Sequence, residues 1–374
     1  MNQGYVKQES VDARTLRGWL ERGESVTVVD VRRAHEHEEW SISGSVGYDV
    51  YDRLKAGDEG AMDDLETLKD GPVVTVCNAG NASTTAAERL RERGIEALTL
   101  DGGMKAWSTA WNTAGVEVPG TDAEVVQVRR TGKGCLSYLI GSGGEAIVVD
   151  ASVDPEVYLC LAEERDLTIT RVIDTHVHAD HLSRSGVLAE LTGATLHMPA
   201  SSPVSYRFDP LRDGDEVRIG GSELRTLETP GHTPESASYL LDGRALFTGD
   251  TLFLSAVGRP DLGSSPEGAR EKARSLHASL GRILSFGPET LVLPGHTSEP
   301  VPFDGVPIAA TLSEVRENTP LLGENEGVFV ERITGSAAPT PENHERIVEI
   351  NRTGEWPEED TAELEAGANR CAAG

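Results

Sequence analysis

Residues 175–181 read THVHADH, which places three histidines and an aspartate within one short segment. The segment follows an apolar run that begins at residue 171 and reads as a strand, so its polar side chains fall in the loop at the carboxyl end of that strand. Three more predicted strands end similarly, in TPGHT (229–233), TGD (248–250) and PGHT (294–297). These strand ends supply five histidines and two aspartates, a ligand set that suits a borderline divalent metal. The sequence therefore predicts a metal centre.

The HxHxDH segment, the later GH, GD and GH motifs and a strand ending in Asp150 resemble the metallo-β-lactamase superfamily over residues 122–374. The resemblance implies an αββα sandwich with the metal at one edge of its sheets. Members include thioester hydrolases of the glyoxalase II kind and persulfide dioxygenases, so family membership alone does not choose the reaction.

Three features resemble the persulfide dioxygenase branch. VGRPDL (257–262) places Arg259 nine residues after Asp250, TPGHTPES covers 229–236, and two carboxyl-terminal segments, 343–351 and 368–372 (ANRCA), are similar to that branch's tail. The resemblance implies one Fe(II) per chain, bound by His176, His232 and Asp250. Such a facial triad leaves three positions open for dioxygen and a substrate sulfur.

The same resemblance implies the reaction of a low-molecular-weight thiol persulfide with O₂ and water to give sulfite and the thiol. Arg259 and Asp261 are expected to stiffen the wall of the site through a bidentate pair. The remaining four candidates would act around the iron or hold a second metal: His178, Asp180, His181 and His296. Because all seven possible ligands are present, a thioester hydrolase with two zinc ions, or with zinc and iron, stays open as the alternative.

The amino-terminal residues alternate helix and strand signals, which indicates an α/β domain with a mainly parallel sheet. Cys77 ends a predicted strand and precedes a helix start, where backbone N–H groups and the helix dipole stabilise a thiolate. This loop, DVR (30–32) and LDGGMKAW (100–107) resemble a single-domain rhodanese over residues 8–115. The resemblance implies sulfur transfer through a Cys77 persulfide. Asn78 and Ala82 stand where such loops often carry basic residues, which disfavours thiosulfate as the donor.

A length of 374 residues suits two domains. The Gly-, Pro- and Thr-containing stretch 113–121 is typical of a connection, and we place the domains at 1–115 and 122–374 with a linker at 116–121. A third hypothesis is a sulfur-sensing protein without catalysis, in which the amino-terminal domain only binds. The carrier thiol is not identified, and a homo-oligomer stays open.

The net charge of −28 disfavours nucleic acid and anionic membranes as partners. Few lysines and many acids suggest a surface adapted to high salt, where charge repulsion is screened. Without a signal peptide or membrane-spanning run, we expect a cytoplasmic protein. The four cysteines do not suggest disulfides: Cys135 and Cys160 are expected in the core, and Cys371 lies in the resembled tail without a mechanism.

Overall fold

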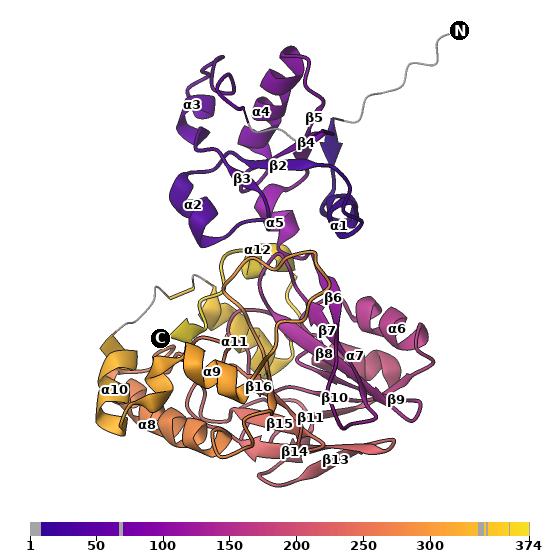
Figure 1. Ribbon diagram of the computed structural model, residues 1–374, viewed down its shortest axis with the longest axis vertical. Helices are drawn as coiled ribbons and strands as arrows, with labels where there is room; N and C mark the ends of the chain where they lie inside the picture. Colours follow the sequence, from indigo (N-terminus) through magenta and orange to yellow (C-terminus); the bar gives the residue numbers. More distant parts are fainter. Residues whose placement is uncertain (1–8, 67–69, 336–339, 342, 359, 374) are drawn as a thin grey trace.

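Short buried strands build the amino-terminal domain, which is the upper part of Figure 1. The structure is a computed structural model that describes residues 9–66, 70–335, 340–341, 343–358 and 360–373. All strand pairings in this domain are parallel, as expected where strands alternate with helices. In spatial order the sheet contains β1 (Ser10–Val11), β5 (Ala97–Leu100), β4 (Val73–Val76), β2 (Thr27–Asp30) and β3 (Val46–Gly47).

Helices cover both faces of this parallel sheet, so the domain has two cores. Side chains from α3 and α4 pack on one face, and side chains from α1 and α5 pack on the other. The carboxylate of Asp12 accepts the backbone N–H of Thr15 at 2.8 Å and so caps α1. The helices are α1 (Ala13–Glu21), α2 (Ala34–Glu39), α3 (Tyr51–Lys55), α4 (Asn81–Glu92) and α5 (Gly103–Trp107).

Two sheets packed face to face form the carboxyl-terminal domain. In order, the first contains β12 (Asp209–Leu211), β11 (Thr195–Pro199), β10 (Thr168–Ile173), β9 (Glu145–Val149), β8 (Leu136–Ser142), β7 (Glu124–Arg129) and β6 (Asn112–Val116). The second contains β13 (Glu216–Ile219), β14 (Ser222–Glu228), β15 (Ala237–Leu241), β16 (Ala245–Gly249), β18 (Leu291–Pro294) and β19 (Ala310–Thr311). A separate two-stranded ribbon pairs β17 (Val257–Gly258) with β20 (Ala372–Ala373).

Each outer face of this sandwich carries helices, so the predicted αββα architecture is confirmed. One apolar core lies between the sheets, a second lies under α6 and α7, and a third lies under α8, α9 and α10. None of the helices in the described ranges combines the length and apolar character needed to cross a bilayer. The helices are α6 (Pro155–Glu163), α7 (Ser185–Thr192), α8 (Pro266–Ile283), α9 (Leu312–Asn318), the 3₁₀ helix η1 (Pro320–Gly323), α10 (Glu326–Gly335), α11 (His344–Thr353) and α12 (Thr361–Glu365).

The first half of the segment expected to be the linker forms a strand. Residues 112–116 form β6, which pairs antiparallel with β7 and so belongs to the seven-stranded sheet. The prediction of an irregular connection over 113–121 is therefore wrong for residues 113–116. Backbone pairing with a long neighbouring strand outweighs the weak strand preference of the sequence NTAGV.

The carboxyl-terminal tail lies between the two domains, where Figure 1 shows α12 in yellow beneath α5. Lys105 on α5 pairs with Glu363 at 3.0 Å and Asp360 at 3.2 Å. Further along the tail, Arg370 pairs with Glu39 of the amino-terminal domain. The tail therefore joins the domains through ion pairs in addition to the covalent connection.

Candidate metal centre

The loops that carry the predicted ligands meet at one edge of the sandwich. β9 and β10 run parallel, so the loops after them lie side by side. β14 and β16 are both antiparallel to β15, and β16 is parallel to β18, so their carboxyl ends also point the same way. The seven candidate side chains are all buried: His176, His178, Asp180, His181, His232, Asp250 and His296. Strand direction thus converts motifs that are distant in sequence into one buried cluster.

Three of these residues form a group suited to one metal ion. Oδ2 of Asp250 lies 3.9 Å from Nε2 of His176 and 3.7 Å from Nε2 of His232. Nε2 of His176 and Oδ2 of Asp250 are buried without hydrogen-bond partners among the described residues. An ion at about 2.0–2.2 Å from each atom would satisfy them. The donor set and its unpaired atoms therefore fit a metal.

Neighbouring groups orient these three ligands. Nδ1 of His232 lies 2.9 Å from the carbonyl oxygen of Arg259, so Nδ1–H donates there and Nε2 keeps its lone pair for a metal. Burial is the main cause that lowers the pKa of His232, which keeps the ring neutral as metal binding requires. Burial raises the pKa of Asp250, but His296 and the two histidine ligands outweigh burial and hold it well below its usual value. The site is therefore set up as two neutral imidazoles and one carboxylate.

His178 lies beside a different pair of carboxylates. Its Nε2 is 3.2 Å from Oδ1 of Asp150 and 4.0 Å from Oδ1 of Asp174. Asp150 also accepts the backbone N–H and the hydroxyl of Thr175, at 2.7 and 2.9 Å. Nδ1 of His178 has no hydrogen-bond partner in the described part of the chain. Asp150 therefore orients His178 with that nitrogen still available.

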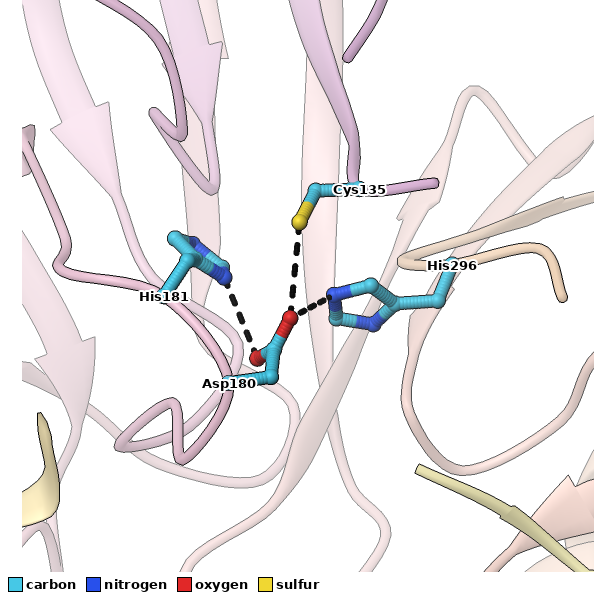
Figure 2. Close-up of side chains that lie close together, drawn as sticks. All are labelled: Cys135, Asp180, His181 and His296. Atoms are coloured by element: carbon cyan, nitrogen blue, oxygen red, sulfur yellow. Dashed lines mark hydrogen bonds and ion pairs between the residues drawn. The ribbon is translucent and has the colours of Figure 1, made fainter. Parts of the chain in front are cut away.

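The remaining three candidates gather around a cysteine, as Figure 2 shows. Asp180 contacts Nδ1 of His181 at 3.1 Å through Oδ1, and Oδ2 accepts from the Cys135 thiol at 3.4 Å. Nε2 of His296 lies 2.7 Å from the same Oδ2 without the alignment of a hydrogen bond. Cys135 is buried, as the sequence predicts, but it belongs to a polar cluster that the sequence does not reveal.

The charged groups of this second cluster shift one another's pKa values. Burial and the Asp180 carboxylate raise the pKa of Cys135, but His181 and His296 outweigh them and lower it to about 7. Burial lowers the pKa of His181, but Asp180 and Cys135 raise it to about 10. A cation bound here would therefore compete with protons on the two histidines.

The GRPDL segment forms the wall next to His232. Arg259 donates from Nε and Nη2 to the two carboxylate oxygens of Asp261, at 2.8 and 2.6 Å, so the expected bidentate pair is present. A Cβ on Gly258 would lie 1.8 Å from the backbone oxygen of Asp250 and 2.9 Å from Cβ of His232. Only glycine lets this strand pass so close to two candidate ligands.

The tail motif ANRCA packs against the same wall. The N–H of Arg259 donates to the carbonyl of Cys371 at 3.0 Å, and β20 continues the pairing with β17. The Cys371 sulfur belongs to a group with Asp250 and His296 whose ligand atoms lie within 4.8 Å of one another. Burial, followed by the nearby carboxylates, raises the pKa of Cys371 well above its usual value. Cys371 therefore contacts the wall through its backbone, and its sulfur lies beside Asp250 and His296.

Cys77 lies in the amino-terminal domain at the end of β4, as predicted, and its side chain is buried. The backbone N–H of Ser83 donates to its sulfur at 3.4 Å, and the Ser83 hydroxyl lies at the same distance. α4 begins at Asn81, after Gly80, whose left-handed φ of 92° turns the chain into the helix. The first turn of α4 thus contacts the thiol.

Cys160 differs from its prediction. We expected a core position beside Leu161, but Cys160 is exposed whereas Leu161 is buried. Successive helix residues are about 100° apart, so a buried residue does not imply a buried neighbour. The expectation for Cys160 is therefore wrong.

Sequence patterns of two known families match the two parts of the chain. The pattern described as metallo-beta-lactamase superfamily matches residues 130–296, and the rhodanese-like domain pattern matches residues 12–110. A probable metallo-hydrolase from Burkholderia pseudomallei is 31% identical, over 52% of this chain and 80% of that protein. The chain belongs to the metallo-beta-lactamase superfamily. Its amino-terminal part is a rhodanese-like domain.

Other relatives of this superfamily member differ in their names. The crystal structure of ETHE1 from Myxococcus xanthus is 33% identical with a TM-score of 0.55, and covers 61% of this chain and 97% of that one. A metallo-beta-lactamase from Staphylococcus aureus is 28% identical with a TM-score of 0.58, and covers 63% and 74%. A hydroxyacylglutathione hydrolase from Anaeromyxobacter dehalogenans is 36% identical over 45% of this chain, and the match spans 63% of that relative's length.

Proposed function

We propose that this protein is an Fe(II)-dependent persulfide dioxygenase coupled to sulfur transfer through Cys77. The observation that carries the proposal is the group of His176, His232 and Asp250, two imidazoles and one carboxylate whose ligand atoms lie within 4.8 Å of one another. Ferrous iron in such a triad keeps three positions open on one side. The reaction is R–SSH + O₂ + H₂O → R–SH + SO₃²⁻ + 2 H⁺, in which the outer sulfur is oxidised and O₂ is reduced.

The chain's own residues prepare this site in three ways. The Arg259 carbonyl fixes the orientation of His232, and the Arg259–Asp261 pair holds that backbone in place. His296 contacts Oδ1 of Asp250, which leaves Oδ2 for the metal. The side chains of the site are buried, which strengthens their electrostatic interactions with a bound ion. Iron, when bound, supplies the redox chemistry that dioxygen activation requires.

The amino-terminal domain suits the same sulfur chemistry. A thiol at the start of a helix, in contact with the Ser83 N–H, is placed to accept the outer sulfur of a persulfide and pass it to a carrier thiol. Similarity to a protein named ETHE1 along almost its whole length supports the dioxygenase assignment for the other domain. The fusion would then join a sulfur-carrying cysteine and a sulfur-oxidising iron through a shared small thiol.

A specific observation favours a second candidate, a thioester hydrolase with two zinc ions or with zinc and iron. Nδ1 of His178 and Nε2 of His181 are unpartnered among the described residues, so two further ligand atoms are available. A matching relative is named hydroxyacylglutathione hydrolase. In that case Asp180, His181 and His296 would hold the second ion, and His178 would add a ligand to one of the two ions.

Metal analysis with two activity assays separates these candidates. Protein purified without oxygen is expected to hold one iron per chain and to consume O₂ with glutathione persulfide, forming an equal amount of sulfite. His232→Ala and Asp250→Ala are expected to lose both iron and sulfite formation, whereas His35→Ala, at an exposed position, retains them. Two zinc ions with thioester cleavage and no oxygen uptake would establish the hydrolase. Iron and sulfite formation that survive His232→Ala would refute the proposed ligand set.

A further inference from the structure

A cavity of about 920 Å³ lies between the two domains, away from both sites described above. The amino-terminal domain contributes residues 13, 14, 17 and 109–111, and the carboxyl-terminal domain contributes residues that include Arg130, Ser152, Cys160, Arg184 and Trp356. Neither Cys77 nor any of the seven metal-ligand candidates lines it. Small-molecule sites commonly measure about 300–1,000 Å³ and often lie at domain interfaces. The cavity therefore has the size and place of a ligand site.

Arginines outnumber acidic residues in the lining of this cavity, although the chain carries a net charge of −28. Four arginines line it, against the two acidic residues Asp154 and Glu156. Arg130 and Arg184 are buried and share a single carboxylate, that of Glu365, so the three side chains retain one positive charge. The other two arginines are Arg14, which is exposed, and Arg17. Arg17 pairs with Glu21, so Arg14 is the lining arginine without an ion pair among the described residues, and its charge is available to an anionic occupant.

Aromatic and apolar side chains form another part of the lining. Trp356 is 48% exposed and Val187 is 37% exposed, two of the four large hydrophobic residues exposed in the described part of the chain. The guanidinium of Arg184 lies 5.5 Å from the Trp356 ring centroid, and that of Arg17 lies 4.1 Å from the Trp111 ring centroid. A flat ring on a ligand could stack on Trp356 while its acidic group meets a neighbouring arginine.

Two polar groups of the lining have unused hydrogen-bonding capacity among the described residues. The hydroxyl of Ser152 is buried without a hydrogen-bond partner, and Ser152 is 1% exposed. Nε of Arg17 also makes no hydrogen bond, although it lies 3.5 Å from the Glu21 carboxylate. Buried donors usually have partners in folded proteins. Both donors belong to residues that line the cavity, and neither has an acceptor among the described residues.

We propose that this cavity binds an organic anion that carries a flat aromatic ring together with a sulfonate, phosphate or carboxylate group. The ligand contacts α1 and Trp111 on one side and α6, Arg184 and Trp356 on the other, so it bridges the domains. Arg184 lies three residues after His181, and its partner Glu365 also accepts the N–H of Leu182 at 2.7 Å. An occupant that contacts Arg184 therefore reaches, through Arg184 and Glu365, the loop that carries His181.

The test uses 8-anilinonaphthalene-1-sulfonate, which combines a sulfonate with flat rings and fluoresces in apolar sites. Titration of the full-length, metal-loaded protein is expected to show one saturable site per chain. Arg14→Glu and Trp356→Ala are each expected to weaken binding at least tenfold. Arg270→Glu and Val306→Ala provide matched controls, because both positions are exposed and lie outside the cavity, and they are expected to bind as the unaltered protein does.

Alkylation of Cys160, which is exposed and lines the cavity, supplies a second measurement. The bound probe is expected to slow modification of Cys160 in the unaltered protein and to have no such effect in Trp356→Ala. Binding that does not saturate, or that is equal in all four variants, would overturn the proposal, as would unchanged Cys160 reactivity. Neither measurement depends on persulfide oxidation, so failure here is distinct from failure of the proposed function.

Discussion

Glu365→Gln tests how the tail is anchored. The Glu365 carboxylate is fully buried and accepts from Arg130 at 3.1 and 3.2 Å, from Arg184 at 2.7 Å and from the Leu182 N–H at 2.7 Å. Glutamine keeps the shape but removes the negative charge of the carboxylate that both buried guanidiniums contact. Breaking a buried ion pair on one side typically costs about 3–5 kcal/mol, and we expect a loss in that range in the free energy of unfolding.

Urea unfolding followed by circular dichroism measures this loss. The matched control is Glu363→Gln on the same helix, where the side chain is 73% exposed and pairs with Lys105 at 3.0 Å. An exposed pair contributes less than about 1 kcal/mol, so this variant is expected to unfold almost as the unaltered protein does. Equal and small losses for the two variants would refute the reasoning that burial makes Glu365 important.

The same carboxylate predicts a dependence on pH. Burial raises the pKa of Glu365, but Arg130 and Arg184 outweigh burial and hold the pKa well below its usual value. A lowered folded-state pKa means that the contribution to stability is complete above the unfolded pKa of about 4.3 and is lost as the pH falls below it. Glu365→Gln is therefore expected to show a shallower loss of stability below pH 4.3 than the unaltered protein. Parallel acid curves would contradict this.

Three further predictions concern the two sites. Gly258→Ala should lower the free energy of unfolding by about 1–3 kcal/mol and release metal, because the new Cβ would meet the Asp250 backbone oxygen at 1.8 Å. Gly281→Ala is the control, because its Cβ would meet open space, and it should do neither. Thermal melting and metal content measure the two effects. Arg259→Lys should lose about 1.5–3 kcal/mol in urea unfolding, since lysine cannot replace the bidentate pair; an unchanged midpoint would contradict that. Cys77→Ser should abolish sulfur transfer to a thiol acceptor and leave sulfite formation from supplied persulfide intact. If the protein is a sensor without catalysis, the unaltered protein would already lack both activities.

The sandwich could be predicted because the motifs resemble a known superfamily, and most of its metal-ligand candidates could be predicted because each motif follows an apolar strand. Burial fixes such strands, and parallel strands bring their carboxyl ends to one edge, so a pattern in sequence becomes a cluster in space. Cys135 was missed as part of that cluster because it precedes β8, which runs antiparallel to β9. The amino end of β8 therefore lies beside the carboxyl end of β9. Searching the starts of antiparallel neighbours would have found it.

Other features depended on tertiary context that no local pattern carries. The segment NTAGV becomes β6 only because β7 offers a free edge. Glu365 lies in an acidic tail that resembles a solvated segment, yet two arginines from distant loops bury it completely. The cavity between the domains is likewise formed by residues more than 300 positions apart, which only docking of the two domains brings together.

The tail also affects when the metal pocket is completed. Asn369 donates to Asp180 at 3.4 Å across 189 positions of sequence, and β20 pairs Ala372 with Gly258 of β17, which is 114 positions earlier. Contacts between such distant segments form slowly, because the chain must lose much conformational freedom before they stabilise it. Closure of the pocket is therefore expected late in folding, and an ion that binds only the closed form would pull the last folding step to completion by mass action.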